Sequence, residues 1–423
     1  MDSVRLRNDY MEFVRNTLTM VDTLATGVGV VVSSKGKIHQ EIFTPPQQIL
    51  QCLVRMGSFN SAPKILNSDC QDEEVRLPEG ISRHELIQFC QKHKQHYPLF
   101  KRSFRKAKEP YFSDYGIKYR KLNSYSKGCS DYISTPSTLR VFQWNVLAQA
   151  LGRMNDNFAR CPVQALDWES RKYKMVEEIV QYCPDVICLQ EVDHFNYLKY
   201  VLGTQGYSGT FFPKPDSPCV YIDGNNGPDG CAIFYRTDKF DLLQFEYKVL
   251  EIWKVQSNQV ALLVILKLRG TDQEICITTT HLKARTGVFL STFRNEQGKD
   301  LIDFVSSHCG NRPVVLCGDF NAEPSEPVYS TVTNNSFLDL SSAYADCQPP
   351  DVSPCEPPYT TWKIRDEGEI CHTIDYIFYS RKKLEVDAVL ELPSGEDIGE
   401  DRVPSFCYPS DHFSLCTDFK LLC

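Results

Sequence analysis

Polar residues suited to acid, base and metal chemistry follow several short apolar runs of this chain. The run Val314-Val-Leu-Cys-Gly-Asp-Phe-Asn321 ends abruptly in Asp319 and Asn321. Such a run is typical of a strand buried on both faces, and Gly318 marks a bend or a close backbone approach. An Asx turn, in which Asp319 and Asn321 bond nearby backbone, would explain the motif equally well. Neighbouring runs must therefore decide between a turn and a site.

The same pattern recurs along the chain at the ends of other predicted strands. In chain order these ends are Asn145, Glu191, His281, Asp319 with Asn321, Asp375, and Asp411 with His412. Taken singly, each has a structural explanation as a turn, a helix cap, a salt-bridge partner or a satisfied core histidine. Six such ends in one chain favour a shared cleft, because residues at strand ends commonly line one.

The residue types at these ends indicate one kind of chemistry. Carboxylate and amide oxygens suit a hard cation such as Mg²⁺, which takes one or two carboxylates plus substrate phosphate oxygens. Histidine beside aspartate suits acid, base or phosphate-stabilising work near neutral pH. Metal-assisted hydrolysis of a phosphoester would use all of these groups.

Hydrophobic patterning predicts the elements that carry these residues. From Leu139 onward, short apolar runs alternate with amphipathic stretches, which predicts an α/β domain. Two sheets with helices outside them fit the number of strands better than one small sheet does. Strands are predicted over residues 141–145, 185–191, 210–214, 230–235, 260–268, 275–281, 313–319, 374–379 and 410–419, and helices over 168–180 and 292–305.

The first third of the chain differs in character, and we predict a partly disordered accessory region over residues 1–135, ahead of a catalytic domain over 136–423. Within it, Ser82-Arg-His-Glu85 resembles a capping box, which predicts a short helix. The stretch Lys101–Lys108, with Lys118, Arg120 and Lys121 beyond it, interleaves cations with aromatics, as nucleic-acid contacts do. A solvated basic linker is the preferred interpretation of this stretch.

Composition bounds the class of protein. Among 423 residues, 42% are hydrophobic, and the net charge of −8 argues against a surface that embraces polyanions everywhere. The 18 cysteines are scattered without a CxxC pair, so buried reduced thiols are expected rather than a zinc cluster or disulfide framework. No apolar run is long enough to cross a bilayer, and no membrane partner is expected. The acidic N-terminus does not fit a transit peptide, so a cytoplasmic location is expected, and a mitochondrial one only if another isoform supplies a presequence.

The ordered motifs resemble a known family over about residues 140–420. Trp144-Asn145, Leu189-Gln-Glu191-Val, Gly318-Asp-Phe-Asn321, Ile374-Asp375-Tyr and Ser410-Asp411-His412 are similar to signatures of the exonuclease/endonuclease/phosphatase superfamily. The resemblance implies a four-layered αββα sandwich of two mixed β-sheets flanked by helices. It also implies a Mg²⁺ ligand at Glu191 with Asn145 beside it, and Asp319 and Asn321 handling the attacking water and phosphate.

The remaining catalytic positions are two histidines and an aspartate. The resemblance implies that His412 contacts the scissile phosphate, and we expect His281 to be a catalytic residue as well. Asp375 is expected to hold a histidine, with His412 as the first choice, and to raise its basicity. Mg²⁺ on Glu191, together with nearby cations, would neutralise the phosphoryl oxygens in the transition state.

Further segments, over 145–149, 209–215, 225–231, 257–261, 280–287 and 357–365, resemble one branch of this superfamily. That branch is implied to remove the 2'-phosphate of NADP⁺ and NADPH, giving NAD⁺ and NADH, and to have a circadian or metabolic role. Its cations would converge on one rim and favour a compact ligand with several phosphates, although ordinary surface lysines and arginines are the simpler interpretation. The expected substrate-binding residues are Glu191, Lys214, Asn258, His281, Leu282, Lys283, Ala284, Arg285, Asp319, Phe320, Asn321, Arg365 and His412.

Two alternatives stay open. A poly(A)-specific 3' exoribonuclease, or deadenylase, would share the strand-end residues and the metal chemistry. RNA is possible but not favoured as a partner, because residues 1–140 show no leucine-rich repeat and the chain is acidic. A catalytically silent module that senses NADP(H), or docks on an RNA–protein assembly, would be expected to lose acidic or histidine positions, and here all are intact. The sequence does not identify protein partners.

Overall fold

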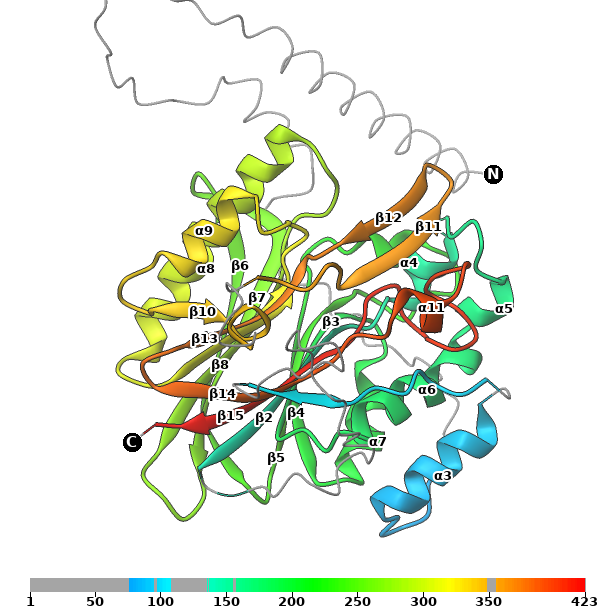
Figure 1. The fold of residues 1–423 in the computed structure, drawn as a ribbon, viewed down its shortest axis with the longest axis horizontal. Coiled ribbons are helices and arrows are strands. Elements are labelled where there is room, and N and C mark those ends of the chain that lie inside the picture. Colours follow the sequence, from blue (N-terminus) through cyan, green and yellow to red (C-terminus); the bar gives the residue numbers. More distant parts are fainter. Residues whose placement is uncertain are drawn as a thin grey trace, which may run out of the picture. The chain divides into compact units, whose positions relative to one another are not determined.

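The structure is a computed structural model that describes residues 76–94, 97–107, 135, 137–154, 157–347 and 355–422. All of these belong to the second of two units into which the chain divides, residues 60–423. Most of the predicted disordered extension lies outside the described residues. Figure 1 shows the arrangement of the elements named below.

Two mixed sheets form the centre of this unit. The first has the order β1 (Phe104–Lys106), β14 (Leu384–Leu390), β15 (Leu415–Leu421), β2 (Thr138–Asn145), β3 (Val186–Val192), β5 (Gly230–Arg236) and β4 (Tyr207–Pro213). The second has the order β10 (Leu340–Ser342), β13 (Asp375–Ser380), β9 (Val314–Asp319), β8 (Glu274–His281), β7 (Val255–Leu268) and β6 (Phe240–Ile252). Each sheet contains one parallel pair, β2 with β3 and β8 with β9. A separate hairpin joins β11 (Thr361–Arg365) to β12 (Gly368–His372).

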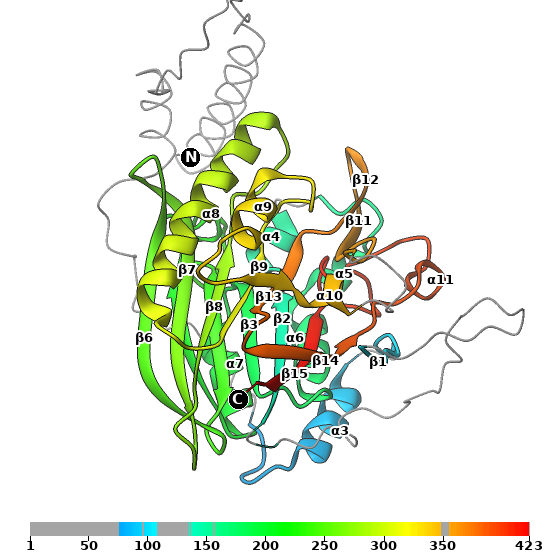
Figure 2. The same cartoon turned by 60° about the vertical axis from the view of Figure 1, so that its left-hand side comes forward.

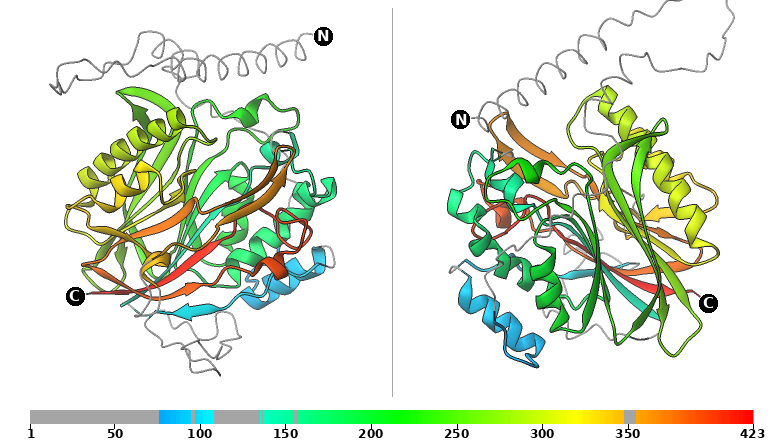
Figure 3. Two further views of the ribbon diagram at one scale, coloured as in Figure 1. Left: turned by 45° about the horizontal axis from the view of Figure 1, so that its top comes forward. Right: turned by 180° about the vertical axis from the view of Figure 1, so that it is seen from behind.

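Helices cover the outer faces of both sheets. The face of the first sheet carries α6 (Trp168–Val180), α7 (Phe195–Gly203) and α3 (Arg83–His93), and that of the second carries α8 (Val288–Cys309) and α9 (Pro327–Thr333). Figures 2 and 3 show α8 and the α6–α7 pair on opposite sides, with the sheets between them. The remaining helices are short: α4 (Gln149–Met154), α5 (Val163–Leu166), α10 (Ala343–Asp346), α11 (Gly395–Ile398) and the 3₁₀ turn η1 (Pro218–Tyr221). The predicted four-layered αββα sandwich is therefore confirmed.

The strand β9 shows how the pattern of the sequence produces these layers. Val315 and Cys317 lie in the apolar core between the sheets, whereas Val314 and Leu316 lie in the core beneath α8. The side chains alternate between two buried faces, as expected for a continuous apolar run in a central strand. A Cβ on Gly318 would lie 2.4 Å from the carbonyl oxygen of Thr280 on the parallel neighbour β8. The predicted close approach at this glycine is confirmed.

Several element predictions differ from the structure in their extent. The helix predicted over 292–305 is confirmed but runs from Val288 to Cys309, and the strand predicted over 410–419 begins only at Leu415. Residues 410–414 form a loop held by strand-like bridging of His412 to Thr361. The strands β6, β12 and β14 were not predicted, because their apolar residues alternate with charged ones and none ends in a recognisable motif.

The segment ahead of the predicted catalytic domain gives one confirmation and one correction. The helix α3 begins after Ser82, whose side chain accepts from the backbone of Glu85 in the predicted capping box. The basic stretch 101–108 is not a solvated linker over its described part, because Phe104–Lys106 form β1 and pair with β14. The boundary at residues 135 and 136 stays a prediction.

The cysteines named by their apolar surroundings, Cys188, Cys231, Cys276 and Cys317, are buried free thiols, as predicted. Cys183 departs from that expectation because it is disulfide-bonded. No helix within the described ranges is both long and apolar enough to cross a membrane.

Candidate active site

The residues predicted at strand ends meet at one edge of the two sheets, although Asp375 begins β13 and Asp411 and His412 lie ahead of β15 rather than at the end of a strand. In the second sheet, His281 on β8 stands opposite Asp319 on β9, which in turn stands opposite Asp375 on β13. The first sheet contributes Asn145 from the end of β2, and its amide nitrogen donates to Asp319 Oδ2 at 2.9 Å. The same nitrogen donates to Glu191 Oε1 at 3.1 Å. One amide therefore joins carboxylates from both sheets.

Glu191 is held in an unusual backbone conformation. Its φ of 54° lies in the left-handed region, at a point where the register of β3 against β5 shifts between Leu189 and Val192. Such bulges re-aim a side chain, and a non-glycine residue with positive φ at a strand end is typical of functional sites. The aimed carboxylate accepts from the backbone nitrogen of Ala148 through Oε2 at 3.1 Å. Its side chain remains 14% exposed, which leaves it open to a ligand.

Asp319 both forms an Asx turn and contributes a carboxylate oxygen to the site, which were the two alternatives left open by the sequence. Its Oδ1 accepts from the backbone nitrogen of Asn321 at 2.9 Å, as in an Asx turn. Its Oδ2 faces the site, where it lies 3.5 Å from His281 Nε2 and 3.8 Å from His412 Nε2. Burial raises the pKa of Asp319 to about 7, although the cationic His412 beside it acts in the opposite direction. The turn therefore aims one carboxylate oxygen into the cluster.

His412 is paired with Asp375, as predicted. Its Nδ1 lies 2.9 Å from Asp375 Oδ2, which leaves Nε2 facing Asp319. Burial lowers the pKa of His412, but the charges of Asp375 and Asp411 outweigh that effect and raise it to about 9. The ring is therefore an imidazolium at neutral pH. Asp375 is fixed in turn by Thr360, whose hydroxyl donates to Oδ2 at 2.7 Å.

The second histidine has the opposite character. Burial pushes the pKa of His281 well below its ordinary value, and the nearby cations Lys214 and His412 lower it further. A neutral imidazole thus stands beside a charged one. Its Nε2 lies 4.0 Å from Glu191 Oε1 and 3.5 Å from Asp319 Oδ2, and its buried Nδ1 has no hydrogen-bond partner within the described structure.

Three of the predicted cations belong to this neighbourhood. Lys214 is buried and its Nζ lies 2.6 Å from Asp229 Oδ2; burial lowers its pKa, but Asp229 and Glu191 raise it above the ordinary value. Burial lowers the pKa of Lys283 to about 8, and Arg285 and Lys214 add to that effect. No carboxylate of the described residues forms an ion pair with Lys283, and Arg285 is exposed to solvent. A half-buried ammonium whose pKa is lowered by two other cations has an electrostatic environment that favours an anion.

The loop that carries Lys283 and Arg285 is held in place by helix α8. Arg294 on that helix is buried and donates to the backbone oxygens of Lys283 at 3.0 Å and Arg285 at 2.7 Å. Arg285 itself has a φ of 79°. Carbonyl oxygens are thereby turned toward the helix, and the loop does not depend on the cationic side chains for its own shape.

The hairpin β11–β12 adds a residue that sequence reasoning missed. Lys363 Nζ lies 2.5 Å from Asp411 Oδ2 and 3.5 Å from His412 Nε2. The predicted Arg365 follows two residues later, and its Nη2 lies 3.8 Å from the same Asp411 oxygen. Since side chains two apart in a strand share a face, recognition of β11 as a strand would have identified Lys363 from Arg365.

Other predicted substrate contacts are placed differently. Leu282 and Phe320 are buried in the core beneath α8, and only their backbone can face a ligand. Ala284 is exposed on the cationic loop. The amide of Asn258 is engaged with Asp216, whose backbone nitrogen donates to Asn258 Oδ1 at 2.8 Å. A direct substrate role for these four residues stays a prediction.

The donor set fits a hard metal ion. Asp319, Asp375 and His412 place ligand atoms within 4.8 Å of one another, but Asp375 Oδ2 and His412 Nδ1 already bond each other. Oxygens of Glu191 and Asp319, which converge on one amide nitrogen, form the better pair for Mg²⁺. Asn145 presents that nitrogen rather than its oxygen, which accepts from the backbone of Leu147 at 3.0 Å. Its predicted part as a ligand therefore stays a prediction.

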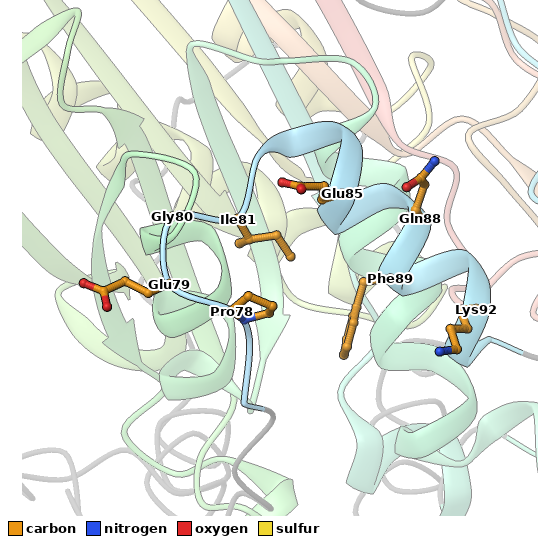
Figure 4. Close-up of a pocket in the computed structure, with 8 residues that line it drawn as sticks. All are labelled: Pro78, Glu79, Gly80, Ile81, Glu85, Gln88, Phe89 and Lys92. Carbon is orange, nitrogen blue, oxygen red and sulfur yellow. The ribbon is translucent and has the colours of Figure 1, made fainter.

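A separate cavity of about 380 Å³ is lined by residues between Pro78 and Lys92, which precede all of the active-site residues in sequence (Figure 4). It is lined by the turn at Pro78–Ile81 and by α3 side chains including Phe89 and Lys92. None of the strand-end residues contributes to it, so it is not the candidate active site.

Comparison with known proteins agrees with this geometry. Residues 142–412 match the model of the Endonuclease/Exonuclease/phosphatase family. Nocturnin from Drosophila melanogaster is 52% identical over 404 residues, which cover 90% of this chain and 62% of that protein. Nocturnin from Xenopus laevis is 51% identical over 288 residues, covering 67% of this chain and 73% of that protein. The chain belongs to the endonuclease/exonuclease/phosphatase family, in its nocturnin branch.

A solved structure of the same branch extends this comparison. The human nocturnin catalytic domain with bound sulfate anion superimposes with a TM-score of 0.60 at 39% identity, covering 77% of this chain and 99% of that one. The chain spans 62% of the length of the Drosophila relative. Endonuclease/exonuclease/phosphatase enzymes are metal-dependent hydrolases, and the acidic cluster described above is a possible metal site of this one.

Proposed function

We propose that this protein is a Mg²⁺-dependent phosphatase that removes the 2'-phosphate of NADP⁺ and NADPH, giving NAD⁺ and NADH. The observation that carries the substrate is Lys283, a half-buried lysine without an ion-pair partner in the described structure, whose pKa the cations Arg285 and Lys214 help to lower. A buried cation without a counter-ion is costly unless a ligand supplies the negative charge. Such a pocket suits a small ligand with several phosphates better than it suits one phosphodiester.

Two further observations support the proposal. The human nocturnin catalytic domain binds a sulfate anion, which matches phosphate in shape and charge. The described part of the basic stretch that kept RNA in consideration, residues 101–107, contributes fewer free cations than its sequence indicates, because the Arg102 side chain is buried and Arg105 Nε lies 3.9 Å from Glu391 Oε1. A long cationic track for polyadenylate is therefore not supported by these residues.

In the proposed reaction, water attacks phosphorus in line, the bond to the 2'-oxygen breaks, and that oxygen takes a proton from solvent to become the 2'-hydroxyl of the product. Mg²⁺ held by Glu191, with Asp319 beside it, would supply charge neutralisation for the phosphoryl oxygens. The His412 imidazolium donates from Nε2 to a phosphoryl oxygen while Asp375 fixes its ring through Nδ1. Asp319 orients the water and accepts its proton through Oδ2, the oxygen that faces the two histidines. The neutral His281 contributes a hydrogen bond without adding charge.

The test is to incubate the protein with Mg²⁺ and NADPH and to assay free phosphate, beside a labelled oligo(A). Phosphate release without shortening of oligo(A) supports the proposal. Shortening of oligo(A) without phosphate release would instead identify a deadenylase. Absence of both activities, with NADPH binding retained, would identify a silent binding module. A cytoplasmic location, which rests on the acidic residues near the N-terminus, and a circadian or metabolic role, which only the resemblance to nocturnin supports, are further proposals.

A further inference from the structure

The loop that carries His412 has anchors on two sides. On the side of the active site, the Ser410 hydroxyl donates to the backbone oxygen of Asn145 at 2.6 Å, and Trp144 Nε1 donates to the backbone oxygen of His412 at 2.6 Å. Arg171 on α6 donates to the backbone oxygen of Pro409 at 2.6 Å. Residues 410–414 belong to no strand and have one isolated bridge, from His412 to Thr361, so side-chain bonds of this kind supply much of the support for the position of the His412 ring.

The opposite side of the loop is held by Arg102, which is distant from the loop in sequence. Arg102 donates through Nη1 to the Ser414 hydroxyl at 2.7 Å and through Nη2 to the Ser414 backbone oxygen at 2.6 Å. Its side chain is 0% exposed and is paired with the equally buried Glu178 on α6 at 2.9 Å. A planar guanidinium that grips both the side chain and the backbone of one residue fixes orientation as well as distance.

The same carboxylate closes the network at the start of the loop. Glu178 Oε1 accepts from the Tyr408 hydroxyl at 3.0 Å and from the Ser414 hydroxyl at 2.8 Å. The Tyr408 hydroxyl in turn accepts from the backbone nitrogen of Ser414 at 2.9 Å. Residues 408 and 414, which bracket His412, are thus tied to one buried ion pair. We call Arg102, Glu178, Tyr408 and Ser414 the loop clamp.

We propose that Arg102 is a positioning residue for His412. It touches neither substrate nor metal; through the loop clamp it holds the His412 ring so that Nδ1 stays on Asp375 and Nε2 faces Asp319. Arg102 and Ser414 both lie outside the residues that match the family model, 142–412. The region that matches the family model therefore does not include these two residues. Arg102 comes from the segment before the matched region, and Ser414 comes directly after it.

A buried ion pair could serve stability alone, and the chain offers a matched control for that case. Arg140 on β2 is also buried and donates to Asp418 Oδ2 on β15 at 2.7 Å. It also donates to the Tyr182 backbone oxygen at 2.6 Å. No hydrogen bond of Arg140 reaches residues 408–414 in the described structure, so Arg140→Met removes a comparably buried cation without releasing the loop.

The experiment compares Arg102→Met, Arg102→Lys and Arg140→Met in the full chain, with Mg²⁺ and NADPH, at a temperature where each is folded. We expect Arg102→Met to lower kcat about tenfold or more with KM nearly unchanged, and Arg102→Lys to fall between it and the wild type. Arg140→Met should lower the thermal midpoint while kcat per folded molecule stays within about twofold. Hydrogen exchange of peptides covering 405–416 should increase in Arg102→Met only.

Equal kcat for folded Arg102→Met and Arg140→Met, with equal exchange over 405–416, would overturn the proposal. If Arg102→Met does not fold, Tyr408→Phe replaces it, since that change opens the clamp without leaving a buried charge. The kinetic arm rests on the proposed function, and a wild type inactive on NADPH would refute that function rather than the clamp. Hydrogen exchange then decides alone, because it needs no substrate.

Discussion

The pKa of Lys283 gives a prediction that links the proposed anion site to a measurable pH dependence. Burial lowers this pKa to about 8, so in the free enzyme the ammonium is about 90% protonated at pH 7 and about 10% at pH 9. The sign follows directly, because a lysine carries its charge below its pKa and loses it above. The wild-type kcat/KM for NADPH should therefore fall as pH rises through about 8, approaching tenfold per pH unit.

Two variants separate Lys283 from the other titrating groups. Lys283→Arg keeps its charge throughout the range, so the fall near pH 8 should vanish and leave a later one near 9, where His412 loses its proton. Lys214→Arg is the matched control, because the pKa of Lys214 is raised and its charge is constant over this range. That variant should retain the fall near pH 8 whatever its absolute rate.

The assay is the initial rate of phosphate release at NADPH concentrations well below KM, from pH 6 to 10 with saturating Mg²⁺. The shape of the profile is compared rather than its height, because arginine is larger than lysine and can lower the rate at every pH. A fall near pH 8 that persists in Lys283→Arg would refute the reasoning. It would show that Lys283 does not carry the charge on which substrate capture depends.

The other predictions follow from the same contacts. Lys283→Ala and Arg285→Ala should each reduce kcat/KM for NADPH more than tenfold, which corresponds to about 1.4 kcal/mol. Arg285→Lys should also reduce kcat/KM although the charge is preserved, because lysine cannot bind phosphate through two parallel hydrogen bonds. Steady-state kinetics measure all three. Lys283→Met should abolish activity but raise the thermal midpoint by about 2 °C at pH 7 in the absence of ligand, because a cation without an ion-pair partner is removed from a partly buried position. Calorimetry measures the midpoint, and a lower value in the variant would contradict this prediction. Glu191→Ala should lose activity that saturating Mg²⁺ does not restore, and recovery at high metal would mean that another residue is the principal ligand. Lys363→Met should lower kcat more than it raises KM, because Asp411 loses its 2.5 Å partner beside His412; unchanged kcat would exclude an active-site role for Lys363.

The strand ends were predictable because a short buried strand and the polar residue that ends it are local in sequence. Asn145, Glu191, His281 and Asp319 each follow an apolar run, whereas His412 lies in the loop ahead of β15, and the structure brings all five together. The pairing of Asp375 with His412 also followed from residue type. The layered fold was predictable for the same reason, since alternation in β9 determines which faces are buried.

The parts that could not be predicted depend on contacts between distant segments. Lys363 enters the site only because the hairpin β11–β12 folds over Asp411, and nothing near Lys363 in sequence marks that approach. Arg102 stands in a stretch whose composition favours a solvated linker, yet 312 residues separate it from Ser414, which it contacts. A single arginine looks the same in sequence whether it is solvated or buried against a partner. The difference lies in the packing of Glu178 and β1, which local pattern does not encode.

The layer between the two sheets explains why the active site forms at one end of it. Through most of its length this layer is apolar, and apolar packing alone specifies the relative position of two sheets only loosely. At the end that carries the strand-end residues, three amide side chains cross from the first sheet to the second. Gln143 donates to Asp375 at 3.1 Å, Gln190 to Thr279 at 2.9 Å, and Asn145 to Asp319 at 2.9 Å. Because a buried amide without its partner is costly, these bonds select one placement of the sheets, and in that placement Glu191 and Asp319 both accept from the amide nitrogen of Asn145.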